Sequence, residues 1–270
     1  MSGVGDVTDG APPGRWSAYD RMAQHVAPAG ERLLDLVDGG RSEAATLLDV
    51  GSGSGLGLRA AADRGWVAIG LDRSEDQVAA AGSVVRQVRG DALALPFERA
   101  SFDAAVSNFA LIFAGDVEHA VTEVSQVVRP NGWFAFSAWR PGGWPGAWRR
   151  RMATALGREP TPFPTGLGEA EVARALLVGA GFVDVVVHPE RLRWEFADVD
   201  VAVDTLTSAA GGLRMLRSIA VDAGAWPTVR ELLLDDADRR AVPLAGGGIA
   251  IDDEFLAVAG RRPDSRSGMG

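Results

Sequence analysis

Four glycines alternate with other residues directly after a short apolar run that ends at Val50. They lie at positions 51, 53, 55 and 57, and an alanine-rich stretch follows them. This order predicts a strand that passes through a tight turn into a helix, with bare backbone that a ligand can approach closely. Because Asp49 lies beside the turn, we favour a cofactor-binding turn over a merely flexible connector.

The type of cofactor follows from the pattern around these glycines. The dinucleotide fingerprint G-x-G-x-x-G/A fails here, because its sixth position is a leucine whether the count starts at Gly51 or at Gly53. The frame that fits starts at Gly55, inside the expected helix. The acid at Asp49 would repel a pyrophosphate, but it suits a cofactor that carries an ammonium and a sulfonium group. The charge therefore favours S-adenosylmethionine (SAM) over NAD(P).

Two further carboxylates follow the next expected strands. Asp72 lies 21 residues after Gly51 and can accept hydrogen bonds from two ribose hydroxyls, as the acid at this position of NAD enzymes also does. Asp91 can accept from the exocyclic amine of adenine, with the Ala92 amide near a ring nitrogen. The alternatives are that Asp72 caps a helix and that Asp91 caps a turn.

The elements that position these residues alternate regularly. Short, nearly all-apolar segments end near residues 50, 72, 91, 108 and 139 and are separated by helical stretches, with Ser74 and Asp116 as expected N-caps. This alternation predicts a Rossmann-like, mostly parallel α/β sheet with helices on both faces. Residues 16–37 precede it and are expected to form two short helices, broken at Pro28.

The second half of the chain changes character after Trp139. A helix within residues 166–182 is expected to lead into a strand over 183–196, helical material is expected over 198–240, and a last strand over 253–262. We therefore expect one domain over residues 16–262. A disordered tail over 1–15 is expected before this domain and a polar tail over 263–270 after it. Within the domain we expect a cofactor-binding core over about 44–140 and substrate lid elements over about 16–40, 141–180 and 197–248.

Four segments in this order carry a family resemblance: LLDVGSGSG, GLDRSEDQVAAA, GDALALPFERASFDAAVSNFAL and EVSQVVRPNGWFAFSAW. The chain resembles the class I SAM-dependent methyltransferases, in particular the small-molecule branch that is similar to enzymes of ubiquinone and menaquinone biosynthesis. The resemblance implies a seven-stranded sheet whose last strand is antiparallel, and SAM as the cofactor.

The resemblance also implies roles for individual residues. Asp49, Gly51 and Gly53 would line the methionine end of the cofactor, Asp72 the ribose, and Asp91 with Ala92 the adenine. Asn108 would face the cofactor amino group, and Tyr19 would close over the site from the N-terminal helix. The expected cofactor-binding residues are Tyr19, Asp49, Gly51, Gly53, Asp72, Arg73, Asp91, Ala92 and Asn108.

The substrate side is predicted from aromatic and basic residues. Phe113, Trp139, Arg140 and Trp144 would face a hydrophobic or aromatic substrate, and the alternative is a lid that packs its tryptophans onto the body. Many relatives carry a histidine pair where this chain has Ile112 and Phe113, so that wall is apolar. His25 is the candidate general base, although an ordinary structural histidine is the commoner case.

Composition excludes several function classes. The formal charge of −9 argues against a nucleic-acid partner, and no apolar run approaches the length of a membrane span. All 27 cationic residues are arginine, and the absence of cysteine excludes disulfides and thiolate metal sites. With no leader pattern in the first residues, we expect a cytoplasmic protein with a small-molecule substrate and no metal. The oligomeric state stays open, with a homodimer as one option.

Three functions are consistent with these patterns. The first is methyl transfer from SAM to a small organic acceptor, O-, N- or C-linked, within secondary metabolism. The second is a protein of the SAM-binding fold that does not methylate and uses the bound cofactor structurally in a cyclisation or a binding role. The third is an NAD(P) oxidoreductase, which would bind a nicotinamide cofactor instead of SAM.

Overall fold

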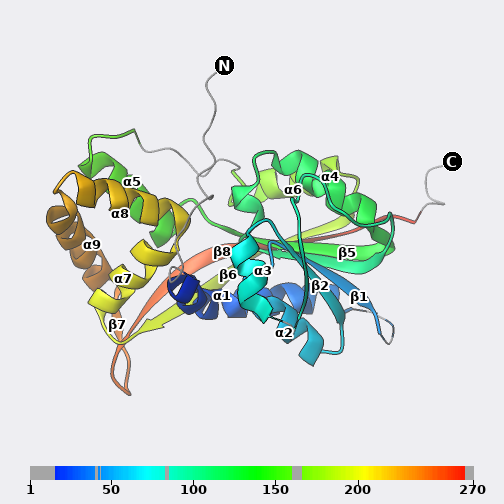
Figure 1. Cartoon of the computed structure of the whole chain (residues 1–270), viewed down its shortest axis with the longest axis horizontal. Coiled ribbons are helices and arrows are strands. Elements are labelled where there is room, and N and C mark those ends of the chain that lie inside the picture. The colour runs from blue at the N-terminus through cyan, green and yellow to red at the C-terminus, as the bar shows by residue number, and fades with distance from the viewer. Residues whose placement is uncertain (1–15, 40–41, 43, 83–84, 160–165, 265–270) are drawn as a thin grey trace.

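A computed structural model describes residues 16–39, 42, 44–82, 85–159 and 166–264, with the side chains of 16–21 left out. The expected N-terminal tail over 1–15 and residues 265–270 of the expected C-terminal tail lie outside these residues. Figure 1 presents a central sheet with helices above and below it and a separate group of helices at one end.

The sheet has the order β3-β2-β1-β4-β5-β8-β6, and these seven strands form one continuous path. All neighbours as far as β5 are parallel, whereas β8 is antiparallel to both β5 and β6. This confirms the predicted Rossmann-like sheet with an antiparallel last strand. The bounds in sheet order are β3 (Arg86–Arg89), β2 (Val67–Asp72), β1 (Thr46–Val50), β4 (Phe102–Asn108), β5 (Val128–Trp139), β8 (Ile249–Arg261) and β6 (Val183–Phe196).

An additional short strand, β7 (Val242–Pro243), pairs with the outer end of β8 and makes this an eight-stranded sheet. Beyond the point where Trp139 pairs with Phe255, β5 ends, but β6 and β8 continue together until Phe196 pairs with Ile249. This extended ribbon carries the sheet out under the helices at the end of the molecule (Figure 1).

Helices cover both faces of the sheet. One face carries α1 (Trp16–Val37), α2 (Leu56–Asp63) and α3 (Glu75–Ala81), and the other carries α4 (Val117–Val127) and α6 (Ala170–Gly179) (Figure 1). The predicted N-caps are confirmed, since Ser74 accepts from the Gln77 amide and Asp116 from the His119 amide. A short 3₁₀ turn, η2 (Leu111–Phe113), follows β4.

The expected break at Pro28 is wrong, because residues 16–37 form a single helix with the proline inside it. Pro28 is exposed, while Ala29, Leu33 and Leu34 are buried in the core. A proline within a helix costs about 3 kcal/mol. Burial of a continuous apolar face against the sheet offsets this cost, and α1 therefore crosses β4 and β5 as one piece.

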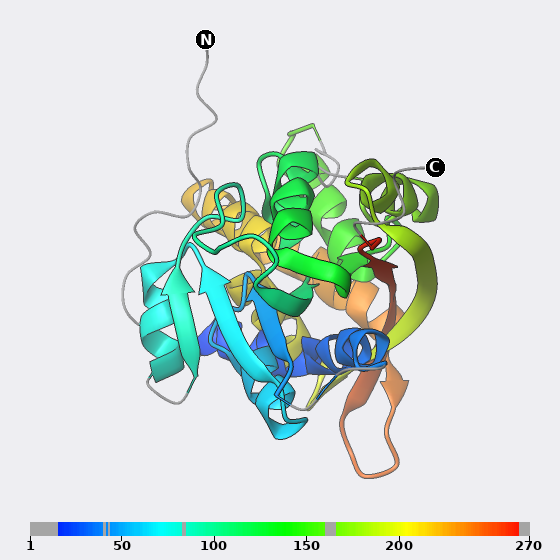
Figure 2. The same cartoon turned by 90° about the vertical axis from the view of Figure 1, so that its right-hand side faces the viewer.

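Four helices form a lid at the end of the sheet, namely α5 (Trp144–Ala155), α7 (Val199–Ala209), α8 (Gly211–Asp222) and α9 (Trp226–Arg240). They pack on one another, and α7 also contacts α1. In Figure 2, viewed from the opposite end of the sheet, the lid lies behind the strands. Helix α6, within the segment expected to join the lid, packs instead against β6 and α4.

Candidate active site

The glycine-rich turn follows the carboxyl end of β1, in the region where open α/β sheets bind ligands, which we call the crevice. Gly51, Gly53 and Gly55 all have positive φ angles, of 77°, 54° and 81°. The Gly51 and Ser52 amides donate to the Leu71 carbonyl at 2.7 and 3.1 Å, which fixes the turn to β2. A Cβ built on Gly51 would lie only 2.2 Å from the Ala110 Cβ, so the turn also packs tightly against the segment after β4.

Asp49 is buried beside this turn and is 5% exposed. Burial and, to a smaller extent, the negative charge of Asp72 together raise its pKa to about 7. The start of α2 passes close to the carboxylate, because a Cβ built on Gly57 would lie 2.9 Å from Asp49 Oδ2. The ionised form of a buried carboxylate is unfavourable by itself and becomes favourable when a cation lies next to it. This environment fits the cationic cofactor that the sequence predicts.

Asp72 lies at the end of β2 and holds two backbone amides. Its Oδ2 accepts from the Gly53 amide and its Oδ1 from the Ser74 amide, both at 2.9 Å. These two bonds fix the glycine-rich turn and the N-cap residue of α3, whereas the cap itself is the Ser74 side chain and not Asp72. A carboxylate has about four acceptor sites, so capacity for two ribose hydroxyls remains. The adjacent Arg73 is exposed.

The segment after β3 presents the residues expected near adenine. Asp91 is exposed, accepts from the Leu93 amide at 2.9 Å and pairs with Ala94 in an isolated bridge. Ala92 is half-buried. The carboxylate thus orders its own turn, and its second oxygen remains available to a ligand. Its role at the adenine stays a prediction.

Asn108, the last residue of β4, connects three elements through its side chain. Its Oδ1 accepts from Ser137 Oγ on β5 at 2.7 Å, and its Nδ2 donates to the Val26 carbonyl of α1 at 3.1 Å. The amide therefore holds α1 onto the sheet. Tyr19 lies in the first half of the same helix, and its side chain falls outside the described residues.

An aromatic cluster begins directly after Asn108 and extends toward the lid. Phe109 stacks on Trp139 with ring centroids 3.7 Å apart, and Trp139 lies 5.8 Å from Trp194. We define the cluster as Phe109, Trp139, Trp144, Trp194, Phe196 and Phe255, which are joined by ring contacts. It connects the end of β4, beside the glycine-rich turn, to the extended ribbon of β6 and β8.

His25 lies against this cluster. Its ring is 4.7 Å from Phe196 and 5.4 Å from Trp194, measured between centroids. Burial lowers the pKa of His25, and this effect outweighs the nearby charge of Glu195, which raises it. The imidazole is therefore neutral at pH 7 and can accept a proton. Its catalytic role stays a prediction.

The four expected substrate residues have different environments. Phe113 is 59% exposed, Trp139 is half-buried, and Trp144 is completely buried. Arg140 lies 3.7 Å from Glu254 in an ion pair. Trp144 thus packs within the body, as in the lid alternative, whereas Trp139 contacts Phe109 beside the crevice.

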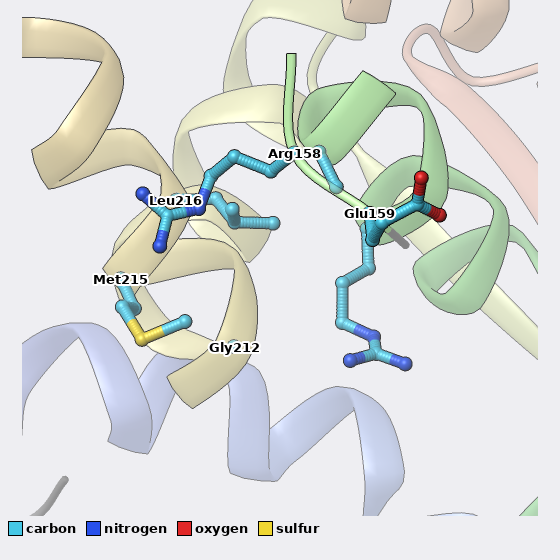
Figure 3. A pocket seen from close by; sticks show the side chains of 7 residues that line it. Arg158, Glu159, Gly212, Met215 and Leu216 are labelled. Atoms are coloured by element: carbon cyan, nitrogen blue, oxygen red, sulfur yellow. The ribbon is translucent and has the colours of Figure 1, made fainter. Parts of the chain in front are cut away.

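A separate cavity of about 430 Å³ lies between α5 and α8. Arg149, Ala153, Arg158, Glu159, Gly212, Met215 and Leu216 line it. Figure 3 presents Arg158 reaching toward Met215 and Leu216, with the Glu159 carboxylate directed away from it. Burial lowers the pKa of Arg149, and the charge of Arg150 lowers it further. This cavity is bounded by lid residues and not by the glycine-rich turn.

Among the described residues, no group of three or more His, Cys, Asp or Glu is arranged to hold a metal ion. Within the same part of the chain, no helix combines the length and the apolar character needed to cross a bilayer.

Sequence reasoning did not single out Trp194, Phe196 or Asp253. All three are buried on the ribbon of β6 and β8. The sequence did hold a signal for Asp253. It lies two residues from both Ile251 and Phe255, so on a strand it shares their inward face. The contacts of Trp194 and Phe196 depend on how two distant strands pair.

The family model for a methyltransferase domain matches residues 48–136, which run from β1 to β5. Malonyl-[acyl-carrier protein] O-methyltransferase of Salmonella typhimurium is 32% identical over 124 residues, which cover 45% of this chain and 49% of that protein. The matched segment holds the strands, the glycine-rich turn and the carboxylates described above. It is similar to the class I SAM-dependent methyltransferases over these residues. The predicted resemblance is confirmed, and it implies SAM as the cofactor.

Solved structures extend the similarity in fold over most of the chain. Phosphoethanolamine N-methyltransferase 2 of Haemonchus contortus, in complex with S-adenosyl-L-methionine, has a TM-score of 0.56 at 16% identity and covers 88% of this chain and 53% of that one. The [4+2]-cyclase SpnF has a TM-score of 0.53 at 20% identity, with coverages of 88% and 82%. The chain spans about half the length of the curated relatives that it matches.

Proposed function

We propose that this protein transfers a methyl group from SAM to a small hydrophobic or aromatic acceptor. The observation that carries the proposal is the pair of neighbouring carboxylates, Asp49 and Asp72, around the glycine-rich turn. The buried Asp49, whose pKa is raised to about 7, favours a cationic ligand over a diphosphate. The aromatic cluster that starts at Phe109 then offers a wall for the acceptor.

The bound cofactor supplies an electrophilic methyl group, which moves to the acceptor as the sulfonium becomes a thioether. The main task of the chain is to hold the acceptor in line with that group. Positioning alone can lower such a barrier by roughly 7–11 kcal/mol in favourable cases. Asp49, Asp72 and the turn orient one partner, and the aromatic cluster excludes water and orients the other.

An acceptor with an O–H or N–H group must also lose a proton. His25 is the proposed base, because its half-buried imidazole is neutral at pH 7 and lies on the rings of Phe196 and Trp194. General-base catalysis of this kind contributes about 10²–10⁴-fold. The name of the Salmonella relative supports an oxygen acceptor among the O-, N- and C-linked options. A role in secondary metabolism stays a prediction.

The proposal is tested by calorimetry with SAM and with NAD⁺, followed by turnover with a panel of phenols, catechols and aromatic carboxylic acids. We expect SAM to bind, NAD⁺ not to bind, and S-adenosylhomocysteine to form together with a methylated product. Binding of NAD⁺ alone would refute the proposal. Product formation without S-adenosylhomocysteine would favour the non-methylating alternative.

A further inference from the structure

Three buried polar atoms in the lid half of the protein have no hydrogen-bond partner within the described residues. They are Asp253 Oδ2, Trp144 Nε1 and Trp194 Nε1. The three side chains are 4%, 0% and 1% exposed, respectively. Buried polar groups are nearly always paired, because an unmade hydrogen bond leaves the full cost of desolvation. Three such atoms in one region therefore need an explanation.

These residues belong to one packed region. Leu192 pairs with Asp253 and Trp194 with Ile251 across β6 and β8. Because side chains alternate along strands, Trp194 and Asp253 project from the same face of the ribbon. The Trp144 ring meets the Trp194 ring edge-on, with centroids 5.5 Å apart, and the Trp144 amide donates to Asp253 Oδ1 at 3.3 Å.

The region is continuous with the crevice through the aromatic cluster. Trp194 contacts Trp139, and Trp139 stacks on Phe109 next to the end of β4. Phe255, two residues from Asp253 on the same face of β8, also contacts Phe109, at 5.7 Å between centroids. A molecule lying along these rings would have one end near the cofactor crevice and the other near Asp253.

The chemistry of the three atoms selects the group that can bind there. Each indole offers an N–H donor, and the free Asp253 oxygen offers an acceptor. An alkyl group would leave all three atoms unpaired. A carboxylate would be repelled by Asp253 when Asp253 is ionised, which requires a pH above its raised pKa of about 7. An ammonium group would leave both indoles without an acceptor. A hydroxyl group accepts from an indole N–H and donates to a carboxylate, and thus satisfies both kinds of atom.

We propose that Asp253, Trp144 and Trp194 form a subsite that recognises a hydroxyl group of the methyl acceptor, at the end remote from the cofactor. This inference rests on the proposed function, because it assumes an acceptor that lies on the aromatic cluster. Because all three side chains are buried, a ligand can reach the subsite only if the start of α5, which follows the glycines at 142 and 143, shifts. The second oxygen of Asp253, Oδ1, stays with the Trp144 and Glu254 amides.

Phenol and toluene are suitable probes, because they differ mainly in a hydroxyl against a methyl group. Each is titrated by calorimetry into the protein saturated with S-adenosylhomocysteine. We expect phenol to bind about tenfold more tightly than toluene, because toluene would leave the buried polar atoms without a hydrogen-bond partner. Trp194→Phe and Asp253→Asn should reduce this preference to about twofold or less, with little change for toluene.

Matched variants separate recognition from structure. Trp148→Phe removes an indole N–H that already donates to Asp236 at 2.9 Å, so it should lower the melting temperature and leave the phenol preference unchanged. Trp194→Phe also puts a smaller ring in a buried site but breaks no hydrogen bond, so it should lower the melting temperature less than Trp148→Phe does. Asp252→Asn alters the neighbouring exposed carboxylate, paired with Arg193, and should leave the preference intact.

The outcomes distinguish the two proposals. If S-adenosylhomocysteine binds but phenol shows no preference over toluene, or does not bind, the subsite is refuted and the proposed function stands. A preference that survives in both Trp194→Phe and Asp253→Asn refutes the subsite as well. If neither SAM nor S-adenosylhomocysteine binds, the proposed function itself fails.

Discussion

Gly51 is a residue where both conformation and space require the absence of a side chain. Its φ of 77° is in the left-handed region, and a Cβ would lie 2.2 Å from that of Ala110. We expect Gly51→Ala to lower the free energy of unfolding by about 1–3 kcal/mol and to weaken SAM binding. Urea unfolding and calorimetry would measure these effects.

Gly142→Ala is the control for this change, because no atom lies within 4 Å of a Cβ built there. Its free energy of unfolding should stay within about 0.5 kcal/mol of the parent value. Equal destabilisation by the two variants would contradict the special role of the turn.

Asp49 makes cofactor binding depend on pH. Its pKa of about 7 in the folded, unliganded protein lies above the ordinary aspartate value of 3.8. The folded state therefore holds a proton that the unfolded chain has released, and stability contributed by this group falls as pH rises from about 4 to 7. A cationic ligand prefers the ionised carboxylate, so the dependence of binding on pH has the opposite sign.

We expect SAM affinity to rise roughly tenfold between pH 5.5 and 7, because binding below the pKa requires loss of this proton. Calorimetry at several pH values would measure the slope. The Asp49→Asn side chain cannot ionise, so SAM affinity of this variant should change little between pH 5.5 and 7. A slope that persists in this variant would assign the pH dependence to another group.

Among single residues, the candidate cofactor positions could be read from the sequence because they lie in short motifs at strand ends. Asp49 and Asp72 fall beside the turn as expected, since the carboxyl ends of neighbouring parallel strands meet. The side-chain partners of Asn108 could not be predicted, because they come from α1 and β5, which are remote in sequence.

The elements were predictable to different degrees. Strand β6 (Val183–Phe196) has the predicted bounds, and strand β4 (Phe102–Asn108) ends at the predicted residue, because turn signals follow both segments. Strand β8 starts four residues earlier than predicted, at Ile249. The sequence pattern also gave a wrong helix break at Pro28. Packing of α1 on the sheet keeps the helix continuous through this proline.

Within the lid, Asp236 connects α5 to α9. It is 3% exposed, accepts from Trp148 Nε1 and Arg240 Nε, and pairs with Arg151 at 3.2 Å. Burial raises the pKa of Asp236, but hydrogen bonds from Arg240 and Trp148 outweigh this and keep it below its ordinary value. The ionised carboxylate therefore stabilises the packing of the two helices.

We expect Asp236→Asn to lower the free energy of unfolding by about 2–3 kcal/mol, because it leaves the arginines without their buried counter-charge. Thermal and urea unfolding would measure the loss. Asp235→Asn removes the neighbouring carboxylate, which pairs with Arg239 at the surface, and should cost less than about 1 kcal/mol. Similar losses in both variants would contradict the role of the buried network.

At the scale of the whole molecule, the segment that the family model matches and the lid are separate parts of the chain. The methyltransferase family model covers β1 to β5, whereas the lid and the ribbon of β6 and β8 lie outside the matched residues. The Asn108 amide and the aromatic cluster join these two parts. A ligand bound beside the glycine-rich turn would therefore lie next to the segment that the family model matches and near the aromatic cluster that reaches beyond it.

Because the crevice belongs to the folded state alone, SAM should stabilise the entire domain. A ligand at 100 times its Kd contributes about 2.7 kcal/mol, which for a domain of this size raises the melting temperature by roughly 5–10 °C. NAD⁺ at the same concentration should give no shift, and Asp72→Asn should reduce the shift given by SAM. Thermal unfolding over a series of SAM concentrations would measure this. A melting temperature that does not change with SAM would mean that the turn and its two carboxylates do not bind the cofactor.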